Sequence, residues 1–256
     1  MDLRDKVVVV TGAASGIGRS LARRFAVEGA KAVICSDRDE SGVKAVADGI
    51  GNQARAYVTD VSREVDIVSL IENVETEVGP IDLFCSNAGI GGGRGVETPD
   101  DYWQQIWDVN VMAHVWAARH LVPRMAARGG GYLLNTASAA GLLTQLGSAP
   151  YSVTKHAAVG LAEWLAITHG DEGIVVSVLC PQAVRTAMTA DNPDGVASID
   201  GMMDPDDLAE VTIGCIQREE FLILPHPEVL QYMRNKVNDY GRWIGGMRKL
   251  NRRFQG

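Results

Sequence analysis

The chain of 256 residues is 46% hydrophobic and 22% charged, which is ordinary globular usage and argues against disordered and fibrous classes. This length and composition predict one domain with a substantial core, spanning residues 1–256. The formal net charge of −8 disfavours nucleic acid as the main partner, because phosphate binding normally draws on clustered basic residues.

The distribution of apolar residues, cysteines and histidines carries further expectations. Residues 1–6 are polar and lead straight into an apolar run, which leaves no room for a signal peptide, and no uncharged apolar run approaches about 18 residues. We therefore expect a cytoplasmic protein without stable membrane insertion. The four cysteines lack C-x-x-C spacing and the five histidines lack metal-ligand grouping, so we expect buried free thiols and no metal site.

Short apolar runs alternate along the chain with longer segments of helical period, which is typical of βαβ units. The runs are rich in Val, Leu and Ile, as are strands covered on both faces. The sequence therefore predicts an α/β fold: a Rossmann-type doubly wound parallel sheet of seven strands with helices on both faces. The expected strands are 7–10, 32–36, 54–58, 83–86, 132–136, 175–180 and 222–224, and the expected helices about 17–28, 41–48, 64–78, 100–128, 151–169 and 205–218.

A glycine-rich turn follows the first strand, with the spacing G-x-x-x-G-x-G at positions 12, 16 and 18. Glycines allow a tight turn and close approach of the backbone to a pyrophosphate at a helix N-terminus. We therefore expect Gly12, Ser15, Gly16, Ile17 and Gly18 to contact a dinucleotide. An ordinary tight turn between strand and helix is the alternative interpretation.

The second strand ends in an acidic residue, Asp37, nineteen residues after Gly18. An acid about 20 residues beyond such a turn commonly holds the adenosine ribose hydroxyls. Its carboxylate would repel a 2′-phosphate, so Asp37 predicts NAD as the cofactor. Arg38 could bind that phosphate if its side chain turned inward, which keeps an NADPH-dependent ketone reductase as an alternative. A simple strand-end turn is the other interpretation of Asp37.

Tyr151 and Lys155 lie four residues apart in an expected helix, so they share one face of it. The ammonium can lower the tyrosine pKa from its ordinary value of about 10. Ser138 comes just after the fifth expected strand, thirteen residues before Tyr151. A phenol that exchanges a proton with an alcohol oxygen while a hydride moves suits oxidation of an alcohol or reduction of a ketone. The alternatives are a small-residue turn at Ser138 and a chance Tyr–Lys pair.

Further motifs follow in the chain, and the whole order resembles the short-chain dehydrogenase/reductase family in its single-domain form of about 250 residues. The resemblance covers roughly Lys6 to Leu224. The additional motifs that carry it are Asp60-Val61, Asn87-Ala88-Gly89, Asn110, and Pro181 with Thr186.

The resemblance implies a catalytic role for four residues. By it, Ser138 polarises the substrate oxygen and Tyr151 is the general acid or base. Lys155 lowers the Tyr151 pKa and holds the nicotinamide ribose, and Asn110 fixes a water that relays protons. From its residue type alone, Asn110 is equally well a surface helix residue.

The resemblance also implies further cofactor contacts. Asp60 and Val61 would contact the adenine, and Thr186 would bond the carboxamide or the phosphates. From the residues alone, Asp60 is as readily a turn or helix-cap residue, and the segment 87–89 a strand-to-loop turn. The full set of expected contacts beyond the glycine turn and Asp37-Arg38 is Asp60, Val61, Asn87, Ala88, Gly89, Tyr151, Lys155, Pro181, Val184 and Thr186.

The expected substrate pocket departs from the family at one position. The family usually has glycine after the proline that follows the sixth strand, and this chain has Gln182. We expect Gln182 to face the pocket and to contact substrate together with Ser138, Ala140 and Tyr151. Segments 90–95 and 139–145 are mostly small or apolar, which predicts a fairly apolar or cyclic secondary alcohol or ketone. The segment 185–203, with its turn signals at Asp191–Gly195, is expected to be an irregular loop that acts as a lid or a binding element.

The C-terminal segment, about 227–256, is expected to be a helical tail. Residues 234–253 hold seven basic residues and one acid, with Trp243, Met247, Leu250 and Phe254 at helical spacing. Such a helix can lie on a membrane surface, but packing against the domain or a neighbouring subunit is favoured. The resemblance implies a homotetramer whose tails border an adjoining active site. A dinucleotide-binding regulator without turnover is the remaining alternative.

Overall fold

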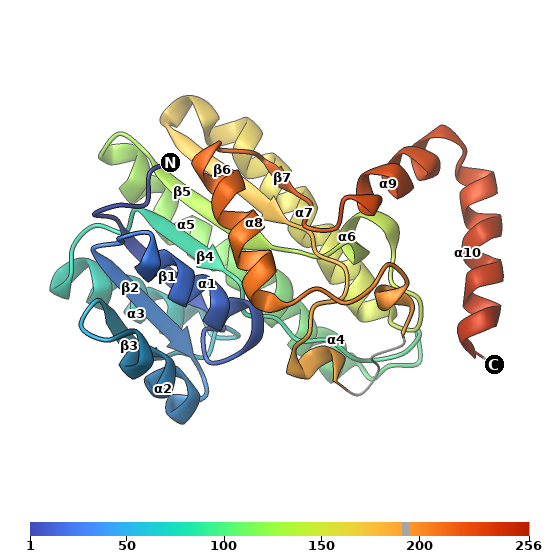
Figure 1. Ribbon diagram of the computed structural model, residues 1–256, viewed down its shortest axis with the longest axis horizontal. Helices are drawn as coiled ribbons and strands as arrows, with labels where there is room; N and C mark the ends of the chain where they lie inside the picture. The colour runs from blue at the N-terminus through green and yellow to red at the C-terminus, as the bar shows by residue number, and fades with distance from the viewer. Residues whose placement is uncertain (191–194, 256) are drawn as a thin grey trace.

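The computed structural model describes residues 1–190 and 195–255, and within them the core is a parallel sheet of seven strands (Figure 1). The strand order is β3-β2-β1-β4-β5-β6-β7, so the order reverses between β1 and β4. The carboxyl ends of these two strands therefore flank the crevice where doubly wound folds bind ligands. The strands are β1 Val7–Thr11, β2 Ala32–Asp37, β3 Ala54–Val58, β4 Leu83–Ser86, β5 Gly131–Thr136, β6 Ile174–Leu179 and β7 Leu222–Ile223.

Helices cover both faces of the sheet because the strands are apolar on both sides. Along β1, Val7 and Val9 pack in one core cluster while Val8 and Val10 pack in another. The first cluster includes apolar side chains of α3 Glu64–Glu77, α5 Ala113–Ala127 and α7 Ala149–His169. The second includes those of α1 Gly16–Val27, α2 Glu40–Ile50 and α8 Pro205–Gln217. The predicted fold class is confirmed, and all of these strands and helices except α5 begin and end within two residues of their predicted bounds.

One predicted helix is interrupted. The segment expected to form a single helix over 100–128 contains α4 Asp100–Trp107, a π-helical turn over Asp108–Met112, and α5. The wider turn holds Asn110 fully buried, where its side chain bonds the backbone of Ile90. The periodicity of apolar residues does not reveal this turn, because a π-helical turn adds one residue to the helix without requiring a different kind of residue.

The segment after β6 is more ordered than predicted. It contains the short 3₁₀ turns Ala187–Thr189 and Val196–Ser198, and Val184 pairs with Met203 as an isolated parallel bridge. Of the predicted turn signals at 191–195, residues 191–194 lie outside the described residues. Short helical segments also occur at α6 Ala140–Leu143 and Gly170–Glu172.

The C-terminal tail forms two helices, α9 Glu228–Asn238 and α10 Tyr240–Gln255. Asp239 separates them with extended backbone, φ −154° and ψ 92°. Figure 1 shows α10 standing apart from the sheet at the end of the molecule. Across the described chain, no helix combines the length and apolarity needed to cross a membrane.

Candidate active site

A large cavity opens at the carboxyl ends of the strands. Its volume is about 1540 Å³, above the roughly 300–1,000 Å³ of an ordinary small-molecule pocket. Among the described residues, Asn110 is the predicted site residue that does not line it. The predicted residues that do are Gly12, Ser15, Gly16, Ile17, Gly18, Asp37, Arg38, Asp60, Val61, Asn87, Ala88, Gly89, Ser138, Ala140, Tyr151, Lys155, Pro181, Gln182, Val184 and Thr186.

The glycine turn is shaped to bring backbone close to a ligand. Gly12 and Gly16 have φ of 68° and 51°, which favour glycine. At Gly18 an added Cβ would overlap the carbonyl oxygen of Gly12. Ser15 is the N-cap of α1 and makes no side-chain capping hydrogen bond, so the N–H groups of the first turn have no such partner. A helix N-terminus of this kind fits a pyrophosphate.

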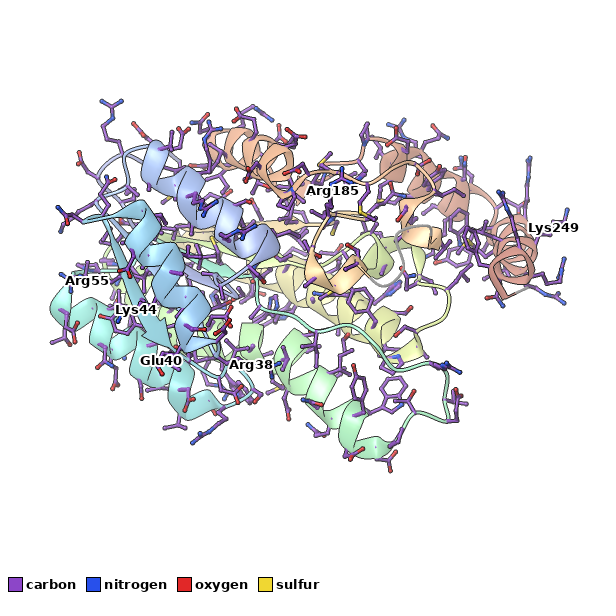
Figure 2. All side chains as sticks on the ribbon, turned by 60° about the horizontal axis from the view of Figure 1, so that its bottom comes forward. Arg38, Glu40, Lys44, Arg55, Arg185 and Lys249 are labelled. Atoms are coloured by element: carbon purple, nitrogen blue, oxygen red, sulfur yellow. The ribbon has the colours of Figure 1, made fainter. Side chains whose placement is uncertain are left out.

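Backbone hydrogen bonds hold the Asp37 carboxylate beside this turn. Its Oδ2 accepts from the Ala14 N–H at 3.0 Å, and its Oδ1 accepts from the Asp39 N–H at 3.0 Å. Arg38 is exposed and lies at the start of α2 (Figure 2). Asp60 forms an Asx turn, since its Oδ1 accepts from the backbone N–H of Ser62 at 3.0 Å while the residue also lines the cavity. Asp60 is therefore both a turn residue and part of the cavity wall.

Asn87 ties three strands together at their carboxyl ends. Its Nδ2 donates to the Thr11 carbonyl at 3.0 Å, and its backbone N–H donates to the Thr11 hydroxyl at 3.0 Å. The Thr136 hydroxyl donates to Asn87 Oδ1 at 3.2 Å. These bonds join β1, β4 and β5, so segment 87–89 is held against the floor of the crevice.

The Tyr–Lys pair lies at the start of α7, deep in the cavity. Ser148 caps this helix by accepting from the Tyr151 N–H at 3.3 Å, so both residues fall in its first two turns. The Lys155 ammonium donates to the Thr136 carbonyl at 3.0 Å and lies 5.6 Å from the centre of the Tyr151 ring. Lys155 is only 3% exposed. The tyrosine and the cation are therefore close enough to influence each other's protonation.

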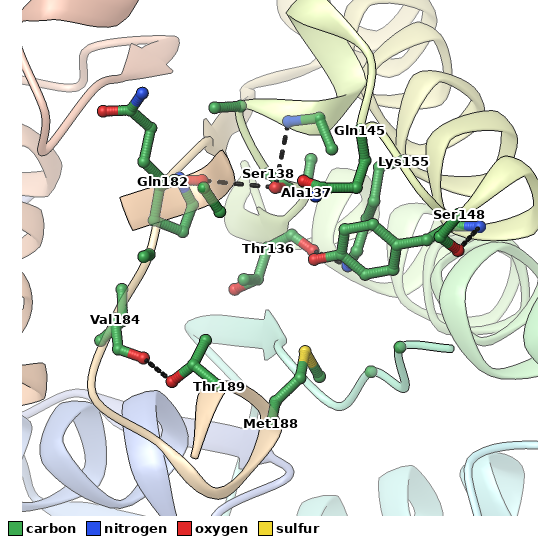
Figure 3. Close-up of a pocket in the computed structure, with 18 of the residues that line it drawn as sticks. Thr136, Ala137, Ser138, Gln145, Ser148, Lys155, Gln182, Val184, Met188 and Thr189 are labelled. Carbon is green, nitrogen blue, oxygen red and sulfur yellow. Dashed lines mark hydrogen bonds between the residues drawn. The ribbon is translucent and has the colours of Figure 1, made fainter. Parts of the chain in front are cut away.

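Burial shifts both of these groups toward their neutral forms. It lowers the pKa of Lys155 to about 8. It also raises the pKa of Tyr151, against which the hydrogen bond with the Ser138 hydroxyl acts. Ser138 is fixed after β5 because its Oγ donates to the Pro181 carbonyl at 3.3 Å and accepts from the Ala140 N–H at 3.1 Å (Figure 3). The structure thus brings Ser138, Tyr151 and Lys155 together.

Asn110 lies behind this group. Its Oδ1 accepts from the Ile90 N–H at 2.9 Å, and its Nδ2 donates to the Ile90 carbonyl at 3.0 Å and the Thr154 hydroxyl at 3.2 Å. A Cβ on Gly89 would lie 3.4 Å from both Asn110 Oδ1 and Lys155 Nζ. Asn110 therefore joins the loop after β4 to α7 next to the lysine, and its link to a relay water stays a prediction.

Gln182 lines the cavity, but its side chain extends away from Ser138 (Figure 3). Its Nε2 donates to Asp200 Oδ2 at 3.0 Å, and the Tyr232 hydroxyl donates to the other oxygen of the same carboxylate at 2.9 Å. The backbone N–H of Gln182 donates to His226 Nδ1 at 3.2 Å. Contact of Gln182 with substrate stays a prediction, while the structure gives its side chain a partner within the protein.

The cavity also includes Gly91 and Met188, which lie in segments expected at the pocket, and residues of the tail that were not assigned to it. Met188 lies over Gly91, whose added Cβ would be 3.5 Å from the Met188 sulfur, so the two loops flanking the cleft approach each other. The tail contributes Trp243, Met247 and Leu250 to the wall. Their helical spacing predicted one apolar face, but nothing in the sequence showed that this face turns to the chain's own cavity.

Replacing Lys155 by methionine should change how stability depends on pH in the absence of ligand. The folded pKa of about 8 lies below the ordinary value near 10.4, so the unfolded chain binds more protons between these values. The free energy of unfolding of wild type, measured relative to Lys155→Met, should therefore rise by about 1 kcal/mol per pH unit across that window. Urea unfolding at about pH 7.5 and about pH 9.5 measures this difference. A constant difference would contradict the assigned burial of the charge.

Comparisons with known proteins identify the relatives of this chain. Residues 6–197 match the family model for short chain dehydrogenase. A 1-deoxy-11-beta-hydroxypentalenate dehydrogenase of Streptomyces exfoliatus is 33% identical over 253 residues, covering 95% of this chain and 91% of that protein. A meso-2,3-butanediol dehydrogenase of Serratia marcescens is 35% identical over 190 residues, covering 74% and 75%.

A solved structure shares the fold over nearly the whole chain. The short chain dehydrogenase/reductase from Burkholderia phymatum, in complex with NAD, matches with a TM-score of 0.86 at 28% identity, covering 94% of this chain and 95% of that one. The chain therefore belongs to the short-chain dehydrogenase family of oxidoreductases, which bind a nicotinamide dinucleotide.

Proposed function

We propose that the protein is an NAD-dependent dehydrogenase that interconverts a secondary alcohol and its ketone. The observation that carries the proposal is that Ser138, Tyr151 and Lys155 line one cavity together with the glycine turn and Asp37. The relatives named for hydroxypentalenate and butanediol support a hydroxylated substrate. The mostly apolar and small side chains around Ser138 support a fairly apolar or cyclic one.

In the oxidative direction, Tyr151 acts as the general base. The Ser138 hydroxyl donates a hydrogen bond to the substrate oxygen, and the Tyr151 phenolate takes the hydroxyl proton as the C–H bond breaks. The nicotinamide, when bound, supplies the hydride acceptor, or the donor in reduction. Since burial raises the pKa of Tyr151, the nearby Lys155 ammonium is needed to stabilise the phenolate.

Lys155 is oriented for this task by the protein. An ammonium has three N–H donors, and the one directed at the Thr136 carbonyl fixes the group under the tyrosine. We assign the other donors to the nicotinamide ribose and to a water held near Asn110. The bonds from Asn110 to Ile90 and Thr154 keep that region of α7 in register with the cleft.

The remaining cofactor contacts follow the shape of the cleft. The unpartnered first turn of α1 suits the pyrophosphate, and Thr186 lies across from it, since an added Cβ on Gly16 would be 2.9 Å from the Thr186 methyl group. Asp60 and Val61 line the cavity beside Asp37, where the adenosine would lie. Thr186 is therefore assigned to the phosphates or the carboxamide.

Tyr151→Phe should abolish most turnover while leaving the fold intact. Loss of the general base should lower kcat/KM for NAD reduction with cyclohexanol or 2-octanol by about 10²–10⁴-fold. Tyr57→Phe is the matched control, because that hydroxyl bonds Glu77 on the surface. Wild-type activity of Tyr151→Phe on every accepted alcohol would remove the mechanism. NAD binding by a wild-type protein that turns over no alcohol or ketone would favour the non-catalytic regulator.

Asp37 should determine the choice of cofactor. Wild type should give higher kcat/KM with NAD than with NADP, and Asp37→Ala should lower the NAD value by about 10-fold or more, because a charge-assisted hydrogen bond to the ribose is lost. Arg38→Ala, at the exposed neighbour, should leave NAD kinetics within about twofold of wild type. Higher wild-type activity with NADP, lost in Arg38→Ala, would instead establish the NADPH-dependent ketone reductase.

We further infer a homotetramer. The helix α7 exposes Val153, Trp164 and Ile167 by 48%, 57% and 84%, and their spacing places them on one face. Large apolar side chains gathered in this way mark an interaction surface. The mass in solution, measured by light scattering, should be four times that of the chain. Trp164→Glu should lower it, and a monomeric wild type would refute the inference.

A further inference from the structure

The cavity continues past Ser138 and Tyr151 to the last helix of the chain. Trp243, Met247 and Leu250 of α10 all line it and are half-buried. Their spacing of four and three residues places them on one face, along about 10 Å of helix axis. Leu146 and Ile199 also line the cavity. The last helix thus contributes apolar side chains to the wall of the cavity.

The near end of this helical wall is anchored to the catalytic region. Trp243 packs on the cluster of Ala139, Leu143 and Val229, and Ala139 directly follows Ser138. In α9, the Lys236 ammonium donates to the Leu142 carbonyl at 2.6 Å. The position of α10 is therefore tied to the segment that carries Ser138.

Beyond Trp243, the described part of this helical wall does not pack on a core cluster as Trp243 does. Within the described chain, Met247 and Leu250 belong to no core cluster, although both are half-buried beside the cavity. The exposed residues of α10 include Arg248 and Lys249, and Figure 2 shows Lys249 at the outer end of the molecule. Arg242 also lines the cavity and is exposed, so the apolar side chains that α10 contributes to the cavity wall are those of Trp243, Met247 and Leu250.

We propose that Trp243, Met247 and Leu250 form a distal subsite for the apolar body of the substrate, so that the preferred secondary alcohols are long or bulky. This inference rests on the proposed function, since it places the reacting carbon at Ser138 and Tyr151. Continuity of the wall with that cavity favours substrate over a second copy of the chain as its occupant. Each methylene buried against the wall should raise kcat/KM by at most about fourfold.

The test compares 2-butanol with 2-decanol as substrates of the full-length enzyme with NAD. In the wild-type enzyme, kcat/KM for 2-decanol should be well above kcat/KM for 2-butanol. Met247→Gln, which keeps the length of the side chain but makes it polar, should lower this ratio by about tenfold, mainly through KM for 2-decanol. Ile244→Gln is the matched control, because Ile244 lies on the same helix, is 52% exposed, and should leave the ratio unchanged.

A second pair of variants disturbs no packing. An added Cβ at Gly245 or Gly246 would have no atom within 4 Å, and both positions are helical. Gly246 lines the cavity, whereas Gly245 is not among its lining residues. Gly246→Glu should lower the 2-decanol to 2-butanol ratio by about tenfold and Gly245→Glu should not, although both add the same charge to α10.

Each outcome separates the subsite from the function. We call Met247→Gln and Gly246→Glu the inner variants, and their controls Ile244→Gln and Gly245→Glu the outer variants. The subsite is overturned if inner and outer variants change the 2-decanol to 2-butanol ratio equally. It is also overturned if the inner variants lower this ratio only together with a change in mass by light scattering, because that would make this face a subunit contact. Failure of wild type to oxidise any alcohol with NAD or NADP would instead overturn the proposed function. A changed ratio for the inner variants alone, at constant mass, supports the subsite.

Discussion

The burial of the Lys155 ammonium is the constraint on which the site depends. A cation that is 3% exposed and bonded to one backbone carbonyl is costly, as the lowering of its pKa to about 8 indicates. The surrounding elements must therefore hold α7 firmly in place. On one side of α7, Gly141 lets α6 pack closely against it. An added Cβ at Gly141 would overlap the Lys155 carbonyl oxygen and force α6 away from α7. On the other side Asn110 bonds Thr154. Neither contact could be replaced by bulkier or apolar residues without moving the lysine.

Much of this arrangement follows from local patterns in the sequence. Alternation of apolar runs and helical segments predicts the parallel sheet, and the chemistry of Gly12 to Gly18, Asp37, Tyr151 and Lys155 predicts which crevice they share. The π-helical turn at Asn110 does not follow in this way. Its cause is tertiary: the buried amide bonds both backbone groups of Ile90, twenty residues earlier in the chain. Helix propensity and apolar periodicity depend on residues that are close in sequence, so they do not predict a hydrogen bond between residues twenty positions apart.

The tail shows the same limit at the level of packing. The spacing of Trp243, Met247 and Leu250 predicts an apolar face on this helix, which is correct. Which part of the protein this face contacts depends on the break between the two helices at Asp239. Its extended backbone ends α9 and redirects α10. Trp243 then reaches the cluster around Leu143, while the next turns of the helix border the cavity. This part of the cavity wall is thus built from residues that lie about a hundred positions beyond Ser138 in the chain.

Gln182 connects the two parts of the cleft. Where the resemblance predicts glycine, its amide donates to Asp200, and Tyr232 of α9 donates to the same carboxylate. Asp200 lies in the segment that returns to pair with Val184, so one carboxylate joins the end of β6, the loop after it and the C-terminal helices. These bonds are exposed and each contributes little alone. Their convergence nevertheless links the segment after β6 to α9, the helix that precedes the one carrying Met247 and Leu250. A glycine at position 182 has no side chain with which to make that link.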